Sequence, residues 1–290
     1  MTSATAAGAG LSDADFERFR EYFYKRTGIQ FTASKRYFVD KRVDACIRNS
    51  GLAGFGAWFA ALRVSDRSDL LQDLINQLTV NETYFLREDY QFDSLLKTVL
   101  PATMAARGGP GRIVGPVKIL SLPCSTGEEP YSIALRLLEE WDQIENVDVE
   151  IHGADIDSDV LTRADHASYG ERSLQRVPKP WLNKYFTQVG AGRYQLDEGI
   201  RSAVTLHQVN VCDTASMRAF RDFDVIFCRN VLIYFDELSS RRAAENLYGS
   251  LRPGGHLFLG HSESMSRISP IFTPTRLPEG IVYQRPTGGK

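Results

Sequence analysis

Cysteine is scarce in this chain, and its cysteines show no pairing pattern. The four cysteines stand far apart, form no C-x-x-C pair and have no histidine beside them: Cys46, Cys124, Cys212 and Cys228. This usage excludes a disulfide framework and a zinc site, and it is typical of reduced thiols in the core of a cytosolic protein. The five histidines also lack the spacing of metal ligands, so we expect no metal.

Long apolar runs and a large net charge are also missing. No run approaches the ~18 apolar residues that cross a membrane. Residues 1–10 are rich in Ala, Gly, Ser and Thr, without the charged and apolar regions of a signal peptide, and predict a disordered tail. The formal net charge of −2 gives no case for a nucleic-acid partner. We therefore expect a cytoplasmic protein that does not insert into a membrane.

Helical periodicity dominates the first part of the chain. Ser12 or Asp13 can cap the first helix, and no strand pattern occurs before residue 110. Helices are predicted at about residues 13–26, 34–49, 55–62 and 69–78. Residues 11–80 are therefore expected to form a small all-α domain, and residues 81–290 a second domain.

The second predicted helix carries a basic face. Four cations lie on the side away from its apolar residues: Lys35, Lys41, Arg42 and Arg48. Surface helices often carry Lys and Arg only to stay solvated, and this is the simpler interpretation for a single helix. The alternative is a docking surface for an acidic helical partner, where electrostatics would set the association rate and the register. Few carboxylates balance this face, so both interpretations stay open.

Residues 117–122 begin the second part with a short apolar run that predicts a buried strand. A turn of small residues and a helix with Pro130 in its first turn follow, as at the start of a nucleotide-binding α/β unit. The turn lacks both G-x-G-x-x-G and G-K-[ST], so it is not a phosphate-binding loop. Glu128 and Glu129 would instead repel a pyrophosphate and accept a cationic ligand, or they only favour the helix dipole.

Polar residues end the strands that follow. Strands are predicted at about residues 149–157, 204–211, 224–230, 256–260 and 281–283, with a turn at 252–255. Asp155 closes the first of these strands, where an acid can accept hydrogen bonds from ribose hydroxyls, and Asn210 closes the second. Asp157 or Ser158 is expected to cap the next helix, and His261 is interpreted as a turn residue without assigned chemistry. The pattern predicts a doubly wound α/β sheet with a ligand site along its carboxyl edge.

Two stretches interrupt this pattern. Residues 78–88 place polar side chains among aromatic ones before a helix predicted at about 89–107, and the simplest interpretation is a helix start capped by Asn81 or Thr83. Arg87 lies so close to apolar residues that it should need a carboxylate or a ligand as partner. Residues from about 173 to 203 predict a short helix and a β-hairpin, which we interpret as a subdomain inserted before the third strand.

Five stretches, taken in order, resemble the motifs of one family. They lie at residues 81–88, 125–132, 155–157, 227–236 and 260–263. From about Leu11 to the last strand, the chain is similar to the CheR-type protein-glutamate O-methyltransferases of bacterial chemotaxis. Each motif alone is weak, but five in order across two domains are highly specific. The resemblance implies a Rossmann-like, S-adenosylmethionine-dependent methyltransferase domain with a small inserted β-subdomain, preceded by a small all-α domain.

The resemblance also implies roles for particular residues. The family's cofactor contacts fall on nine positions of this chain: Asn81, Thr83, Arg87, Glu129, Asp155, Asn210, Val211, Arg229 and Asn230. Tyr234 matches the tyrosine held near the transferred methyl group, and Arg87 matches the arginine beside it, so these two are the implied catalytic residues. The basic face of the second helix matches the surface that meets the helical cytoplasmic region of chemoreceptors.

One departure from the family concerns the inserted subdomain. Some members use it to grip a peptide at the receptor's extreme C-terminus. The loop at residues 190–192 is a few residues shorter here than in those members. We therefore predict no such tether, and we expect a monomer.

The implied reaction converts a receptor glutamate into its methyl ester and leaves S-adenosylhomocysteine. A carboxylate with a pKa near 4.3 is already ionised at neutral pH, so no general base is required. Glu129 would hold the methionyl ammonium, and Asp155 would bind the ribose. Two alternatives stay open: a methyltransferase acting on another protein or a small molecule, and a non-catalytic cofactor-binding regulator on the same fold.

Overall fold

The computed structural model describes residues 10–64, 67–109 and 115–288. Of the tail predicted at residues 1–10, all but Gly10 lies outside the described residues. The described residues form two compact units. One unit contains the residues up to Val80 together with Tyr234–Asp236, and the other contains the rest. No helix in the described part of the chain is long and apolar enough to cross a membrane.

The first unit consists mainly of helices. α1 (Asp13–Thr27) begins after Ser12, whose hydroxyl accepts a hydrogen bond from the N–H of Asp15, and it ends at Gly28, which has a φ of 80°. The other helices are η1 (Ala33–Lys35), α2 (Arg36–Ser50), α3 (Gly54–Leu62) and α4 (Ser68–Leu78). An antiparallel bridge joins Ile29 to Phe235. The four predicted helices are confirmed to within a few residues.

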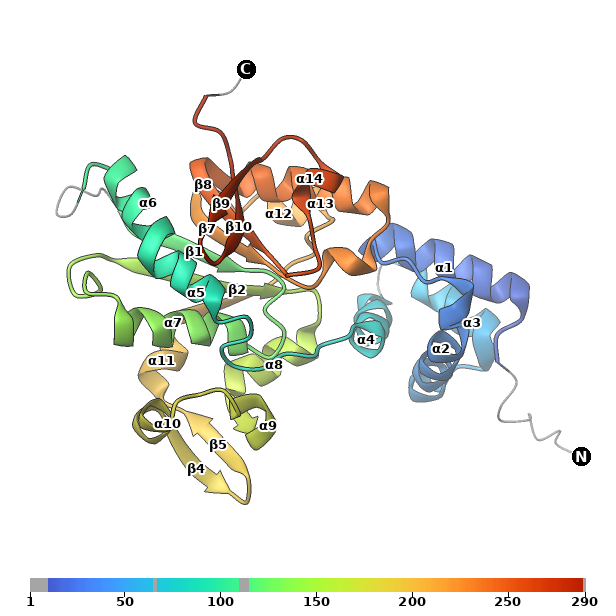
Figure 1. The fold of residues 1–290 in the computed structure, drawn as a ribbon. Helices are drawn as coiled ribbons and strands as arrows, with labels where there is room; N and C mark the ends of the chain where they lie inside the picture. Colours follow the sequence, from blue (N-terminus) through green and yellow to red (C-terminus); the bar gives the residue numbers. More distant parts are fainter. Residues whose placement is uncertain (1–9, 65–66, 110–114, 289–290) are drawn as a thin grey trace, which may run out of the picture. The chain divides into compact units, whose positions relative to one another are not determined.

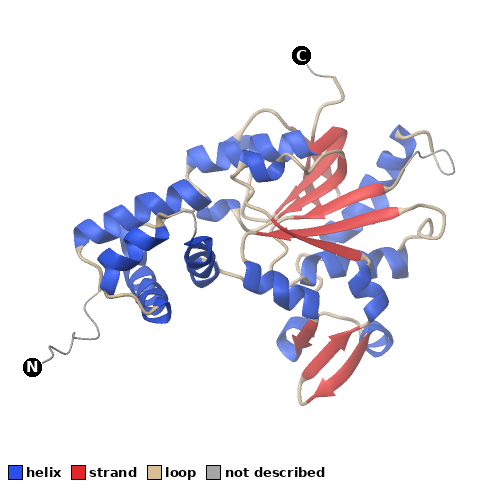
Figure 2. Cartoon of the chain, turned by 180° about the vertical axis from the view of Figure 1, so that it is seen from behind, coloured by secondary structure: helices blue, strands red, loops and turns tan. Residues whose placement is uncertain are grey.

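The second unit is built on a seven-stranded sheet (Figure 2). Its strand order is β6 (Val204–Gln208), β2 (Val149–Asp155), β1 (Val117–Ser121), β7 (Phe223–Cys228), β8 (Leu251–Leu259), β10 (Gly280–Gln284) and β9 (Thr273–Leu277). The first five strands are parallel, and β10 is antiparallel to both of its neighbours. Every residue of β7 is buried, and all of them except Asp224 are apolar, as is typical of a central parallel strand.

Two features of the sheet differ from the sequence prediction. The turn predicted at residues 252–255 lies within β8, where Leu251 faces Phe223 but His256 faces Val225, so these residues bulge out of the ladder. β9 was not predicted, because most of its residues are exposed or only half-buried and it lacks an apolar pattern.

Helices cover both faces of this sheet (Figure 1). The helix predicted at residues 89–107 is present as α5 (Tyr90–Ser94), the π-helical turn η3 (Leu95–Val99) and α6 (Leu100–Ala106). It shares a buried apolar cluster with α7 (Glu128–Glu140) and with Phe227 of β7. The other elements are α8 (Ser158–His166), α12 (Thr214–Met217), η4 (Leu232–Tyr234), α13 (Glu237–Ser250) and α14 (Met265–Ile268).

A second, smaller sheet has three strands, in the order β3 (Ser168–Gly170), β5 (Arg193–Leu196) and β4 (Phe186–Gly190). Around it lie α9 (Glu171–Leu174), α10 (Lys179–Tyr185) and α11 (Glu198–Ser202). β3 lies before the insertion predicted at residues 173–203. The prediction left this strand out, because three residues are too few to carry a recognisable pattern. The predicted fold class, an α/β sheet with an inserted β-subdomain and a preceding all-α part, is confirmed.

Candidate functional site at the carboxyl edge of the sheet

The strand order brings several loops to one edge of the large sheet. From β1 the chain crosses to β2 and then to β6 on one side, whereas β7 and β8 lie on the other side of β1. Ligands of open α/β sheets bind outside the carboxyl ends of the strands at such a switch point. Residues 122–127 follow β1 at this edge, and residues 229–231 follow β7.

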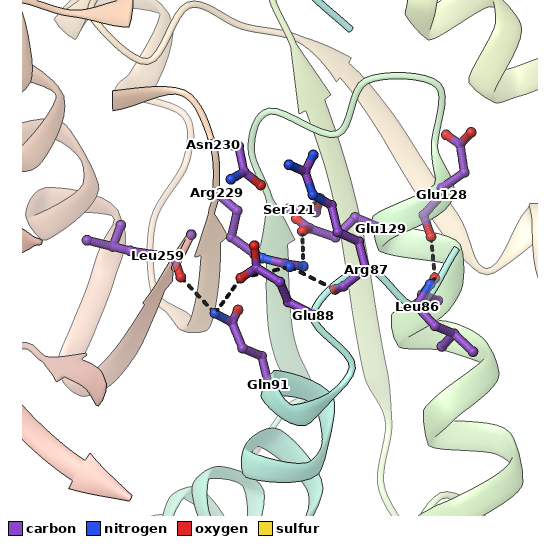
Figure 3. A network of polar contacts seen from close by, with 12 residues as sticks. Leu86, Arg87, Glu88, Gln91, Ser121, Glu128, Glu129, Arg229, Asn230 and Leu259 are labelled. Atoms are coloured by element: carbon purple, nitrogen blue, oxygen red, sulfur yellow. Dashed lines mark hydrogen bonds and ion pairs between the residues drawn. The ribbon is translucent and has the colours of Figure 1, made fainter. Parts of the chain in front are cut away.

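Arg229 is the centre of a buried ionic network at this edge (Figure 3). Its side chain is 2% exposed, and its Nη1 lies 2.7 Å from Oε2 of Glu129. Its Nη2 lies 3.2 Å from Oε2 of Glu88 and donates to the backbone carbonyl of Arg87 at 2.7 Å. A buried charge needs such partners, so the guanidinium holds three different groups at fixed positions.

Glu88 extends the network to the loop after β8. Its Oε1 lies 2.9 Å from Nδ1 of His261, and its Oε2 accepts hydrogen bonds from Tyr90 and Gln91 at 3.2 Å each. Burial would raise the pKa of Glu88, but the Arg229 charge and the hydrogen bond with His261 hold it below its usual value. His261 lies in a turn, as predicted, and its contact with Glu88 has no local sequence signal, because the two residues are 173 positions apart.

Arg87 is presented by a loop with an unusual backbone. Its neighbours Leu86 and Glu88 have φ values of 58° and 54°, in the left-handed region that such residues rarely adopt. The Leu86 N–H donates to Oγ of Ser132 at 2.9 Å, and the Arg87 guanidinium donates to the carbonyl of Glu82 at 2.9 Å. Within the described part of the chain it contacts no carboxylate, so the carboxylate partner considered from the sequence is not observed there.

The adjacent glutamates at the start of α7 have different surroundings. Oε1 of Glu129 accepts a hydrogen bond from Oγ of Ser121 at 2.8 Å, while its Oε2 pairs with Arg229. Glu129 therefore stays at the edge of the sheet. Glu128 turns away and accepts from Thr126 and Ser173 at 2.6 Å each. Burial raises the pKa of Glu128. Of the two glutamates, therefore, Glu129 stays at the edge of the sheet, whereas Glu128 ties α7 to the inserted subdomain.

Asp155 at the end of β2 is 2% exposed. Its carboxylate accepts hydrogen bonds from the N–H groups of Ser125 at 2.8 Å and Asp157 at 3.0 Å, yet burial raises its pKa to about 6. Each oxygen has a further lone pair, which leaves acceptor capacity for a ribose hydroxyl. Asp157 caps α8 as predicted. It also accepts the Asn81 amide at 2.7 Å, so the capping interpretation of Asn81 was wrong: α5 begins only at Tyr90.

Two of the implied cofactor contacts lie in the loop after β6. Oδ1 of Asn210 accepts the N–H of Cys212 at 2.9 Å, and the carbonyl of the buried Val211 accepts the Asn246 amide at 2.7 Å. These bonds shape the loop. Thr83, in the junction before α5, makes no hydrogen bond within the described residues, and the capping role suggested for it has no support.

Glu263 belongs to this edge, although sequence reasoning did not single it out. Its carboxylate accepts three backbone N–H bonds of 2.8 Å, from Asn230, Leu232 and Gly260. Asn230 has a φ of 60°, and a Cβ at position 260 would lie 2.7 Å from Nδ2 of Asn230 and 2.8 Å from Oε2 of Glu263, so a larger residue there would displace these side chains. The one sequence signal for Glu263 is its place in the motif at residues 260–263.

The four cations of the predicted docking face lie on α2 or on the residue before it: Lys35, Lys41, Arg42 and Arg48. The guanidinium of Arg42 lies 3.7 Å from the ring centroid of Phe38, whereas the ion pairs of this helix are formed by Arg36, with Asp13 and Asp40. None of the four pairs with a carboxylate that the structure describes. Tyr37 on the same helix is 82% exposed, an aromatic side chain that the sequence reasoning missed.

Tyr234 belongs to the first unit by its contacts. Its carbonyl accepts the N–H of Gln30 at 3.2 Å, and the nearby Asp236 accepts a hydrogen bond from the Tyr24 hydroxyl at 2.8 Å. The helical unit thus positions Tyr234, and the sheet unit positions Arg87.

The donor set at the sheet edge fits the cofactor that the resemblance implies. S-adenosylmethionine carries a sulfonium, an ammonium, a carboxylate and a ribose diol. Carboxylates at Glu129 and Asp155 match the cationic and hydroxyl groups, and the guanidinium of Arg87 matches an anion. The described residues contain no group of three or more His, Cys, Asp or Glu that could hold a metal ion.

Known proteins resemble this chain over nearly its whole length. The family model described as "CheR methyltransferase, SAM binding domain" matches residues 81–281, and "CheR methyltransferase, all-alpha domain" matches residues 14–79. "Chemotaxis protein methyltransferase 2" of Vibrio cholerae serotype O1 is 48% identical over 280 residues, or 97% of this chain and 96% of the relative. "Chemotaxis protein methyltransferase 1" of Pseudomonas aeruginosa is 32% identical, covering 94% and 98% of the two chains, respectively.

Proposed function

Since the chain belongs to the CheR methyltransferase family, we propose that it transfers the methyl group of S-adenosylmethionine to glutamate side chains of methyl-accepting chemotaxis proteins. The products would be glutamate methyl esters and S-adenosylhomocysteine. One observation carries this function: both family domains match in order, and a chemotaxis protein methyltransferase is 48% identical over 97% of the chain.

The cofactor would bind at the carboxyl edge of the large sheet. When bound, S-adenosylmethionine supplies a methyl group made electrophilic by its positively charged sulfur. We assign the methionyl ammonium to Glu129 and the ribose to Asp155, whose free lone pairs support both roles. Arg229 would act by positioning, since it binds both the Glu129 carboxylate and the Arg87 carbonyl. The other contacts proposed are Asn81, Thr83, Asn210, Val211 and Asn230.

Arg87 and Tyr234 are the proposed catalytic residues. The Arg87 guanidinium would orient a carboxylate of the cofactor or of the acceptor, which fits its lack of a carboxylate partner among the described residues. The Tyr234 hydroxyl would hold the acceptor oxygen or lie against the methyl group. The acceptor glutamate is already ionised at neutral pH, so these residues need only align it and exclude water. No metal has a role in this scheme.

The acceptor would be the helical cytoplasmic region of a chemoreceptor. The basic face of α2 supports an acidic helical partner, because its cations have no described carboxylate partners and Tyr37 offers an exposed aromatic anchor. We propose that the enzyme acts in the cytoplasm as a monomer, without nucleic acid or membrane insertion.

We also propose that no receptor-tail peptide binds the inserted subdomain. Only Ala191 and Gly192 connect β4 to β5, and Gly192 has a φ of 64°, as a tight turn requires. Titration with peptides from receptor C-termini should give no specific binding. Tight capture of one such peptide would contradict this proposal.

Transfer of labelled methyl groups tests the proposed function. The protein is incubated with methyl-labelled S-adenosylmethionine and candidate chemoreceptors, and base-labile label in the receptor is expected. Label in another protein or a small molecule would favour a different acceptor. Binding of the cofactor without any transfer would favour a non-catalytic regulator. No calorimetric heat with either S-adenosylmethionine or S-adenosylhomocysteine would overturn the cofactor assignment.

A further inference from the structure

Two arginines from different segments of the chain lie over the ring of Tyr84. The guanidinium carbon of Arg87 lies 5.8 Å from the ring centroid, and that of Arg176 lies 5.4 Å from it. Arg176 is exposed and lies between α9 and α10, in the inserted subdomain. A guanidinium over an aromatic face is held by the ring while its N–H groups stay available for hydrogen bonds to a carboxylate.

The charges around this ring are not balanced. Neither Arg87 nor Arg176 contacts a carboxylate within the described residues. The neighbouring Arg172 differs, because its guanidinium lies 2.6 Å from Oε1 of Glu82. A carboxylate placed beside either guanidinium would form a charge-assisted hydrogen bond with it. A bound acceptor would supply such a carboxylate.

We propose that Arg176 is a specificity-determining residue that binds a second carboxylate of the acceptor, next to the glutamate that is methylated. This inference rests on the proposed function. An acidic helix presents carboxylates three or four residues apart on one face, about 5–6 Å between Cβ atoms. Arg87 would orient a carboxylate at the reacting end, and Arg176 would bind a flanking carboxylate of the acceptor. The inserted subdomain would thereby select acidic acceptor helices without gripping a receptor tail.

Steady-state methylation with the full-length protein tests this role. The acceptor is a chemoreceptor cytoplasmic fragment, used in its native form and in a form whose carboxylates flanking the methylated glutamates are changed to amides. Arg176→Ala should raise KM for the native fragment about 3- to 5-fold, the range of an exposed ion pair. The affinity for S-adenosylmethionine and kcat should stay unchanged. The increase in KM should disappear with the amide fragment and shrink at high salt.

Two variants serve as comparisons. Arg172→Ala removes an exposed arginine of the same segment, which pairs with Glu82 and has no described contact with Tyr84. Because an exposed ion pair contributes little to the free energy, KM should stay within about twofold of the wild type. Arg176→Lys keeps the charge but loses the planar group over the ring, and it should restore only part of the affinity.

Three outcomes would overturn the role of Arg176. One is a KM equal to that of Arg172→Ala, and another is an equal effect on native and amide fragments. The third is a loss of cofactor affinity in Arg176→Ala, which would place Arg176 at the cofactor instead. In each of these cases the wild type methylates the native fragment, so the proposed function stands. A wild type that binds S-adenosylmethionine but methylates no receptor fragment would remove the proposed function and this role together.

Discussion

Glu129 Oε2 and Arg229 Nη1 lie 2.7 Å apart, in side chains that are 12% and 2% exposed. The same guanidinium meets Glu88 on its other nitrogen, so one positive charge faces two carboxylates. This cluster leaves excess negative charge at the carboxyl edge of the sheet, which favours a positively charged ligand there.

Glu129→Gln should weaken the binding of S-adenosylmethionine about 10- to 100-fold, because an amide cannot replace a charge-assisted hydrogen bond to the ammonium. Isothermal calorimetry measures this affinity directly. Glu139→Gln is the matched control, since Glu139 lies on the same helix but pairs with Lys184 at the surface, and its affinity should not change. Unaltered binding by Glu129→Gln would remove Glu129 from the cofactor site.

Tyr234→Phe should keep the affinity for the cofactor and lower kcat about 100-fold, because one hydroxyl hydrogen bond is lost in the transition state. Calorimetry and methyl transfer to a receptor fragment separate the two effects. Tyr24→Phe removes a hydroxyl that donates a hydrogen bond to Asp236, two residues after Tyr234. This variant controls for disturbance of the local structure. Normal methylation by Tyr234→Phe would exclude the tyrosine from the mechanism.

Reversing charge on α2 with Lys41→Glu and Arg42→Glu should raise KM for the receptor about tenfold at low salt and leave the cofactor affinity unchanged. The effect should weaken as ionic strength rises, because exposed charges are screened. Lys25→Glu, on α1, changes a cation that already pairs with Glu21 and should have little effect. If the double variant methylated receptors normally, the basic face would be only a solvated surface.

His256 in β8 makes stability depend on pH. Burial lowers its pKa to about 4, and its Nδ1 has no hydrogen-bond partner within the described residues. The unfolded histidine takes up its proton near pH 6.5, so as the pH falls from 6.5 to 4 the folded state loses up to about 3 kcal/mol.

His256→Gln should remove this loss, which urea unfolding of both proteins at pH 7.5 and 4.5 would reveal as a smaller drop in the unfolding free energy. Asp155, with a folded pKa of about 6, acts in the opposite direction, but it does so in both proteins. An equal drop in the two proteins would show that His256 does not titrate in this way.

Local chemistry made much of the fold predictable. Ser12 and Gly28 mark the ends of α1 because capping needs only neighbouring backbone groups, and Asp157 caps α8 for the same reason. β7 could be recognised because a strand buried on both faces is mostly apolar, and Asp224 is the one charged residue in it. β3 and β9 were missed, since a very short strand and a largely exposed strand carry no such pattern.

The site was predictable as a set of positions but not as an arrangement. Glu129 and Arg229 were named from motifs, whereas their ion pair follows from β1 and β7 being neighbours in the sheet. Glu128 and Glu129 look equivalent in the sequence, and their surroundings differ only in the folded chain, where Glu128 bonds Ser173 of the inserted subdomain and Glu129 pairs with Arg229.

By itself the sequence determined most of the helices and the buried strands, which polar residues end those strands, and which family the motifs resemble. The tertiary structure alone decided that Glu88, Arg229 and His261 meet and that Arg87 and Arg176 share the ring of Tyr84. The physical reason is that periodicity and capping act within a few residues, whereas these contacts join segments whose proximity depends on strand order and on where the insertion folds back.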